Sequence, residues 1–258
     1  MIDAHVHIER GPYEISWINH FIDQAIESDI SELYLLEHSH RFIEFDEMYS
    51  EIQKHNEYQS NWFGKKERRS INEYIILINN LREMSFPIKI KFGLEICYLP
   101  GVDRIIYEND FKNKFDFLTG SVHWISNWGF DHKKEFWIGK DVDSIYLEYY
   151  KLINEAIESK LFNIIAHPDS IKCFNYYPSF DQGDFLKEIS INAKKNNVKM
   201  EQSCGLFNNY NHTLIGLNQQ FLDILKFHDV EIITASDAHR PEDVGKNIKK
   251  AFEIMNRI

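Results

Sequence analysis

Eight histidine and carboxylate side chains stand in or directly after short apolar runs that are spread over the whole sequence. They are His5, His7, His38, Glu95, His123, His167, Asp237 and His239. Imidazole and carboxylate groups are the protein ligands that suit Zn, Mn and Fe ions. Because alternate residues of a strand point the same way, His5 and His7 are expected to reach one ion together. A single histidine in such a place is commonly an ordinary core residue, so the prediction of a metal site depends on the combination.

These candidate ligands outnumber the needs of one ion. A catalytic ion normally takes three or four protein ligands and keeps one position open for water. If one carboxylate is shared, the set suffices for two ions and nearly for three. Glu9 lies on the same strand face as His5 and His7 and is the candidate to complete a third site, with Glu14 as the alternative. We therefore predict a cofactor of two to three divalent metal ions (Zn, Mn or Fe), among which the sequence does not choose.

Residues this far apart in the sequence can form one site only if the fold brings them together. The hydrophobic pattern predicts such a fold. Short apolar runs alternate with segments of helical period, as in repeated βα units. The expected strands are residues 1–8, 32–37, 88–98, 115–122, 161–166, 198–201 and 230–235, and the expected helices are residues 15–27, 70–84, 144–159, 180–196, 219–227 and 241–255, with a weaker one at 102–113. Six of these seven strands carry a candidate ligand at or near the C-terminal end. In α/β folds those ends share one face, where loops build the active site.

The length and the connections fit one α/β unit. We expect residues 1–258 to form a single domain, since α/β barrels commonly have this length. An open doubly wound sheet would give a similar order of elements. Two connections, residues 41–69 and 124–142, are long and rich in aromatic side chains, which is typical of lids or binding loops. The alternative is that they only cover a hydrophobic rim.

The composition restricts the classes of partner. The formal net charge of −11 disfavours nucleic acids and anionic membranes, which would be repelled at long range. The three cysteines lack CxxC spacing, so they predict no disulfide framework and suit a reducing cytosol. The start, Met-Ile-Asp, lacks the basic region of a signal peptide, and no apolar run reaches membrane-spanning length. We expect a cytoplasmic protein that acts on a small molecule; the sequence does not indicate its oligomeric state.

Six ordered signatures resemble the polymerase-and-histidinol-phosphatase (PHP) family, and within it the histidinol-phosphate phosphatases. They are Asp-Ala-His-Val-His at 3–7, Leu-Leu-Glu-His at 35–38, Gly-Leu-Glu at 93–95, Gly-Ser-Val-His at 120–123, Ile-Ala-His-Pro-Asp at 165–169 and Ser-Asp-Ala-His at 236–239. The resemblance covers the whole chain and is specific as a set. It implies a distorted (β/α)7 TIM-like barrel. It also implies a metal-dependent phosphomonoester hydrolase, with histidinol phosphate, an intermediate of histidine biosynthesis, as the expected substrate.

The resemblance further implies which residues share an ion. One ion would be held by His5, His7, Glu95 and Asp237, a second by Glu95, His123 and His167, and a third by His38 and His239. Many members place a further histidine in the loop after His-x-His, where this chain reads Glu9-Arg-Gly-Pro-Tyr-Glu14. The last ligand of the third site therefore stays open between Glu9 and Glu14.

A cluster of divalent ions suits phosphate monoester hydrolysis, because it screens the substrate and lowers the pKa of a bound water. We expect a hydroxide that bridges the first two ions to attack phosphorus. Asp237, His239 and His40 are the candidates for delivering a proton to the leaving alkoxide.

Four further residues are candidates for binding the substrate. Arg41 and Arg240 directly follow metal motifs and are either phosphate clamps or ordinary surface arginines. Trp124, directly after the fourth strand, is a further candidate for binding the substrate. The segment from Asn127 to His132 resembles a stretch of histidinol-phosphate phosphatases, which implies that its aromatic residues stack on an imidazole and that Asp131 pairs with a cationic ring or amine, unless Asp131 merely serves a turn.

Other functions remain open at this point. The chain could act on another phosphomonoester, such as a nucleotide or a phosphotyrosine. A metal-dependent amidohydrolase also uses His-x-His and a late aspartate, but it often bridges its ions with a carboxylated lysine, where this chain has Glu95. A metal-binding protein without activity is the third alternative.

Overall fold

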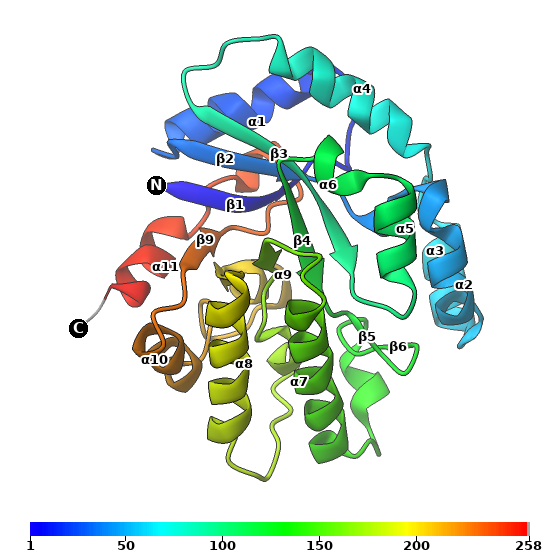
Figure 1. Cartoon of the computed structure of the whole chain (residues 1–258), viewed down its shortest axis with the longest axis vertical. Helices are drawn as coiled ribbons and strands as arrows, with labels where there is room; N and C mark the ends of the chain where they lie inside the picture. Colours follow the sequence, from blue (N-terminus) through cyan, green and yellow to red (C-terminus); the bar gives the residue numbers. More distant parts are fainter. Residues whose placement is uncertain (257–258) are drawn as a thin grey trace.

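The computed structural model describes residues 1–256 and consists of a parallel sheet wrapped by helices (Figure 1). In order across the sheet, the strands are β1 (Ile2–His7), β2 (Glu32–Leu36), β3 (Lys89–Cys97), β4 (Phe117–Ser121), β7 (Ile164–Ile165), β8 (Lys199–Ser203) and β9 (Ile232–Ala235). All neighbours pair in parallel. Since consecutive strands are neighbours, the carboxyl ends of all seven face the same side.

The first and last strands meet and nearly close the sheet into a barrel. Val6 forms a parallel bridge with Ala238, and the His7 N–H donates to the Ala238 carbonyl at 2.8 Å. The Ser236 N–H donates to the buried Asp3 carboxylate at 2.8 Å. The predicted (β/α)7 barrel is therefore confirmed, and the open doubly wound sheet is not.

The barrel interior is filled by a small apolar cluster contributed by several strands. Tyr34 of β2 contacts Phe117 of β4, a strand that is not its neighbour, with ring centroids 4.9 Å apart. The Phe117 ring lies over Gly93 of the intervening strand β3, and curling of the sheet brings such side chains together in the barrel interior. The alternate residues of β2, Leu33 and Leu35, belong instead to the larger cluster beneath the helices. Strand β2 thus buries both of its faces.

Helices cover the outside of the barrel. They are α1 (Ile15–Glu27), α2 (Asp46–Lys54), α3 (Glu57–Gly64), α4 (Ile71–Arg82), α5 (Val102–Glu108), α6 (Phe111–Lys114), α7 (Val142–Glu158), α8 (Gly183–Asn196), α9 (Gly205–Tyr210), α10 (Gln219–Phe227) and α11 (Ile248–Met255). In α1 the buried residues Ile18, Phe21, Ile22 and Ala25 recur at helical spacing, so one apolar stripe faces the barrel.

The last predicted helix, residues 241–255, differs from the structure. A 3-10 turn covers Pro241–Asp243, and α11 begins only at Ile248. Gly245 between them has φ +76, a conformation that an α-helix excludes. Its N–H donates to Asp3 at 2.9 Å. The prediction of one continuous helix was wrong because this tertiary hydrogen bond interrupts it.

The two long connections also contain regular structure that the sequence analysis did not predict. Residues 41–69 contain α2 and α3, and Asn56 directly before α3 is its N-cap, because the Asn56 side chain accepts the Gln59 N–H. Residues 124–142 contain the antiparallel hairpin of β5 (Trp124–Ile125) and β6 (Trp128–Gly129), followed by a 3-10 turn at Lys134–Trp137. Most of their aromatic residues belong to the main apolar cluster, so these connections extend the core of the barrel.

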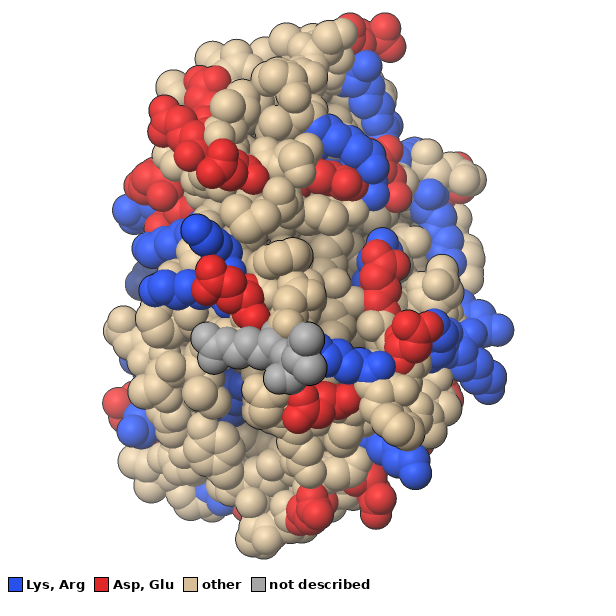
Figure 2. Space-filling model, turned by 90° about the vertical axis from the view of Figure 1, so that its left-hand side faces the viewer, with Lys and Arg blue, Asp and Glu red and all other residues tan. Residues whose placement is uncertain are grey.

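The surface has no dominant sign of charge on the face that Figure 2 shows, where Lys and Arg are interspersed with Asp and Glu. Within residues 1–256, the structure contains no helix that combines the length and the hydropathy needed to cross a membrane. The three cysteines are buried and form no disulfide.

Candidate metal centre

A cavity of about 600 Å³ opens where the strands end. It is lined by Glu9, Arg10, His38, His40, Tyr58, Trp62, Lys66, His123, Trp124, Asp131, His132, His167, Asn208, Asn209, Tyr210, Asp237 and His239. Most predicted ligands are in this lining, and the remaining three, His5, His7 and Glu95, are buried beside it. The barrel therefore gathers all the predicted metal ligands into one site.

Four of the predicted ligands converge at the end of β1. The Nε2 atoms of His5 and His7 lie 2.9 Å apart. Glu95 Oε2 lies 3.7 Å from the first and 3.5 Å from the second, and Asp237 Oδ1 lies 3.8 and 3.9 Å from them. This set is the one that the family resemblance implied for the first ion.

The other oxygen of Glu95 faces a second group. Glu95 Oε1 lies 3.3 Å from His123 Nε2 and 3.2 Å from His167 Nε2. The two imidazole rings are 4.9 Å apart. One carboxylate thus faces both groups, as a ligand shared by two ions would.

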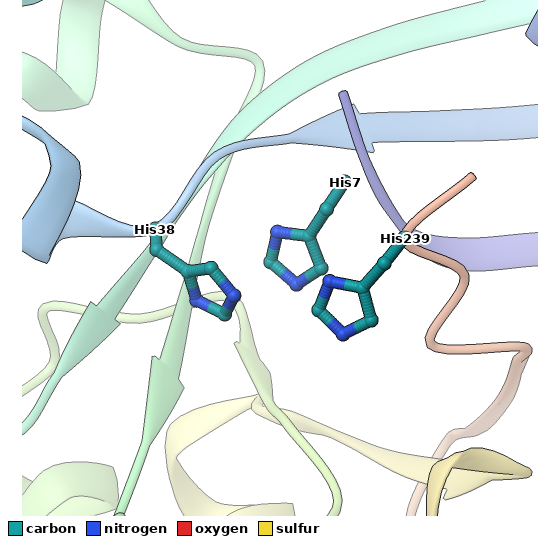
Figure 3. Close-up of side chains that lie close together, drawn as sticks. All are labelled: His7, His38 and His239. Carbon is teal, nitrogen blue, oxygen red and sulfur yellow. The ribbon is translucent and has the colours of Figure 1, made fainter. Parts of the chain in front are cut away.

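Three histidines at the ends of three neighbouring strands, β1, β2 and β9, form a third group (Figure 3). His7 stacks on His38 and on His239, with ring centroids 3.8 and 4.6 Å apart. Glu9 Oε1 lies 3.0 Å from His239 Nδ1, whereas Glu14 is exposed and does not line the cavity. Of the two predicted carboxylates, Glu9 is the one placed at this group.

Polar atoms of the three ligand groups that have no hydrogen-bond partner are consistent with bound cations. Glu95 Oε2 lies 2.6 Å from His38 Nδ1 and is also close to His5 and His7, yet none of these contacts has hydrogen-bond geometry. A buried carboxylate oxygen without a partner is costly. Several coordinating atoms around one point, all from imidazole and carboxylate groups, are the donor set for Zn, Mn or Fe.

The electrostatics at His7 and Glu95 favour the forms that bind metal ions. Burial, with the nearby His38 and His239, holds the pKa of His7 well below its ordinary value. Burial acts in the opposite direction on Glu95, but His38, His123 and His167 outweigh it and hold the pKa of Glu95 well below its ordinary value. A neutral imidazole and an ionised carboxylate are the forms that bind metal ions.

Two carboxylates behind the cluster orient its histidines. His5 Nδ1 donates to Glu201 Oε1 at 2.9 Å, which turns Nε2 of the same ring towards His7. The other oxygen of Glu201 accepts the main-chain N–H of His167 at 3.0 Å. His123 Nδ1 donates to Asp131 Oδ2 at 2.7 Å. Carboxylates in such positions fix the tautomer and direction of metal-binding imidazoles.

The backbone at two predicted ligands is tightly constrained. His167 has φ +29 and Asp237 has φ +57, a region that residues other than glycine rarely adopt. At Gly205, the first residue of α9, a Cβ atom would lie 2.1 Å from Asp237 Oδ2. The glycine is therefore required by the close approach of Asp237, which fixes that carboxylate against α9.

The other predicted site residues divide into two groups. His40, Trp124 and Asp131 line the cavity. Arg41 and Arg240 do not: Arg41 donates to the Glu9 carbonyl at 3.2 Å, and the exposed Arg240 lies 3.8 Å from Glu242. The structure therefore does not support phosphate binding by these two arginines, and that role stays a prediction.

Several residues of the site were missed by the sequence analysis: Arg10, Lys66, Glu201, Asn209 and Tyr210. Glu201 lies at a strand end like the predicted ligands, so the same pattern could have identified it. Lys66 and Tyr210 come from connections whose folding the hydrophobic pattern does not determine.

Comparisons with known proteins agree with this geometry. The family model for the PHP domain matches residues 3–215. A Deinococcus radiodurans protein named probable histidinol-phosphatase is 26% identical over 180 residues, which are 68% of this chain and only 63% of that relative.

Two solved structures share the fold. One is a Lactococcus lactis histidinol phosphate phosphatase complexed with Zn, L-histidinol and phosphate, with a TM-score of 0.70 at 22% identity, covering 98% of this chain and 92% of that one. A Listeria monocytogenes structure has a TM-score of 0.75 at 17% identity, covering 97% and 99%. Because the family model matches most of the sequence and includes the strand ends from β1 to β8, this chain belongs to the PHP domain family.

Proposed function

We propose that this protein is a metal-dependent phosphomonoester hydrolase that converts histidinol phosphate and water into histidinol and phosphate. The observation that carries the proposal is the position of Glu95, whose two oxygens face two separate groups of imidazoles. The names of the Deinococcus and Lactococcus relatives support the choice of substrate.

The residues that would hold the ions are those of the three groups. The first is His5, His7, Glu95 and Asp237, the second is Glu95, His123 and His167, and the third is His38 and His239 with Glu9. Bound ions would screen the phosphate dianion and lower the pKa of the attacking water. Glu201 and Asp131 would keep the imidazoles turned towards the cavity.

The remaining side chains of the cavity would bind and orient the substrate. Trp124 and Trp62 supply aromatic faces for its ring. Asp131 Oδ1 is buried without a hydrogen-bond partner, and it is the acceptor available for an amine or a protonated ring.

Three residues were predicted to deliver the proton to the leaving group. Of these, only His40 belongs to none of the ligand groups, and its Nε2 has no hydrogen-bond partner. Burial and the nearby His38 hold the pKa of His40 well below its ordinary value. At neutral pH it is therefore uncharged, and the protonated form that would deliver a proton is scarce, so Asp237 and His239 remain alternatives for this role.

A panel of phosphomonoesters tests the substrate. With the metal-loaded protein, we expect kcat/KM for histidinol phosphate to exceed that for an aryl phosphate by about tenfold or more. Equal values would indicate a phosphoesterase for another substrate. Hydrolysis of none of the esters would contradict the proposed activity and favour an amidohydrolase or a metal-binding protein.

Elemental analysis tests the cofactor separately. After chelation and reloading with Zn, Mn or Fe, we expect two to three ions per chain. Fewer than two under metal-replete conditions would contradict the shared position of Glu95.

A further inference from the structure

We propose that the ammonium group of Lys66 binds the phosphate group of the substrate and thereby contributes to substrate selection. The inference rests on the proposed function. Lys66 follows α3 in the connection between β2 and β3, and its side chain lines the cavity together with the predicted ligands His38 and His239.

An aromatic contact restricts the position of this ammonium group. Lys66 Nζ lies 4.3 Å from the centre of the Trp62 ring. Trp62 in turn packs against His40 and His132, with ring centroids 4.9 and 5.2 Å apart. A cation over an indole face is stabilised electrostatically, and the contact limits the positions that a flexible lysine can occupy. The charge is therefore held beside the cavity.

No carboxylate neutralises this charge. Among residues 1–256, no acidic oxygen lies within 4 Å of Lys66 Nζ, although Glu9 is near enough to attract it. Lys172 offers the contrast: it is buried in an ion pair with Asp169 and also donates to the Gly216 carbonyl at 2.9 Å. Lys172 is thus occupied within the fold, whereas Lys66 keeps its donors available for an anion.

Other cations are less suited to this role. Among the described residues that line the cavity, Arg10 is the only Lys or Arg besides Lys66, and it is exposed. Arg41 is engaged with the Glu9 carbonyl, and Arg240 lies outside the lining.

The charge of the cavity is consistent with a role for this cation. The chain has a net charge of −11, and Glu9, Asp131 and Asp237 line the same cavity. A phosphate dianion therefore needs local positive charge to enter, and Lys66 would add to the charge that bound ions supply.

Substitution of neighbouring lysines tests the proposal. Lys66→Met keeps the apolar stem on Trp62 and removes the charge, and Lys65→Met, at an exposed position next to it, removes the same charge as a control. With metal-loaded protein, we expect Lys66→Met to raise KM for histidinol phosphate and the inhibition constant of inorganic phosphate about tenfold or more, the loss typical of one charged hydrogen bond. The turnover number kcat should change less. Lys66→Arg should restore part of the affinity, and Lys65→Met should stay within about twofold of the unchanged protein.

The outcomes separate the two proposals. Unchanged KM and phosphate inhibition in Lys66→Met, or an equal effect in Lys65→Met, would overturn the role of Lys66 while leaving the phosphatase intact. If the unchanged protein hydrolyses no phosphomonoester, the proposed function fails. Calorimetric titration with inorganic phosphate then still decides whether Lys66 binds the anion, because weaker binding in Lys66→Met alone supports it and equal binding overturns it.

Discussion

The strand-end cluster and the outer wall of the same cavity are built in different ways. We define the strand-end cluster as His5, His7, Glu95, His167 and Asp237, and the outer wall as Tyr58, Trp62, Lys66, Trp124 and His132. In the cluster, His5 and His7 are 0% exposed and Glu95 is 2% exposed, and the short contacts join polar atoms. The wall is mostly half-buried, and its contacts are aromatic, such as Trp62 on His132 and Tyr58 on His132.

The difference separates chemistry from substrate selection. Ligands on strands are held by the barrel itself, so their mutual positions depend on its hydrogen-bonded ladder. The wall comes from the two connections that follow β2 and β4, and connections vary more readily than strands. We infer that the barrel provides the hydrolytic site and that the connections select the phosphate ester.

The largest effect should come from the residue that joins two ligand groups. Glu95→Gln keeps the size of the side chain but removes the negative charge between five imidazoles. We expect kcat to fall by at least about a thousandfold, more than the 10–100-fold typical of residues behind the ligands. Steady-state kinetics and metal analysis measure the loss. Retention of full activity and metal content would break the assignment of catalysis to the strand ends.

A smaller effect is expected from Glu201, which contacts the predicted ligands from behind. Glu201→Gln removes one of the two acceptors that hold the His5 ring and the His167 N–H. Activity or metal affinity should fall about 10–100-fold. Glu231→Gln is the control. It removes an exposed glutamate that precedes β9 and pairs with Lys199, and it should have little effect on activity or metal affinity. If both variants behave alike, the strand-end cluster does not depend on its buried support.

The fold was predictable from the sequence where short-range pattern and burial agree. Helices α1 and α10 have the predicted bounds, and all seven strands were identified, because each combines an apolar run with a clear period. The break before α11 was not predictable in this way. It depends on a hydrogen bond between Gly245 and Asp3, which are at opposite ends of the chain.

The same division applies to the candidate site. Strand ends converge in any βα barrel, so His5, Glu95, His167 and Asp237 could be placed together from the sequence. The wall could not, since nothing local indicates that Lys66 meets Trp62 beside the cavity or that Arg41 faces the Glu9 carbonyl. Those contacts depend on how α2 and α3 pack against the barrel.

The smallest effect should come from the link between the two connections that form the wall. Gln59 of α3 is fully buried; its amide donates to the carbonyl of Asn127 at 2.8 Å, and its oxygen accepts the Gly129 N–H at 3.1 Å. This one side chain therefore joins α3, which carries Trp62, to the hairpin that precedes His132.

Replacing Gln59 by Leu leaves the buried Gly129 N–H without a partner. We expect a loss of about 1–3 kcal/mol in the free energy of unfolding, measured by denaturant titration, with Gln219→Leu on the exposed face of α10 as the control. Because the strand-end cluster is untouched, KM for the phosphate ester should rise several-fold while metal content stays unchanged. A lower metal content with unchanged KM would reverse the division of roles, since the link would then support the metal centre rather than the wall. A loss of stability with both properties unchanged would mean that the wall holds its shape without this link.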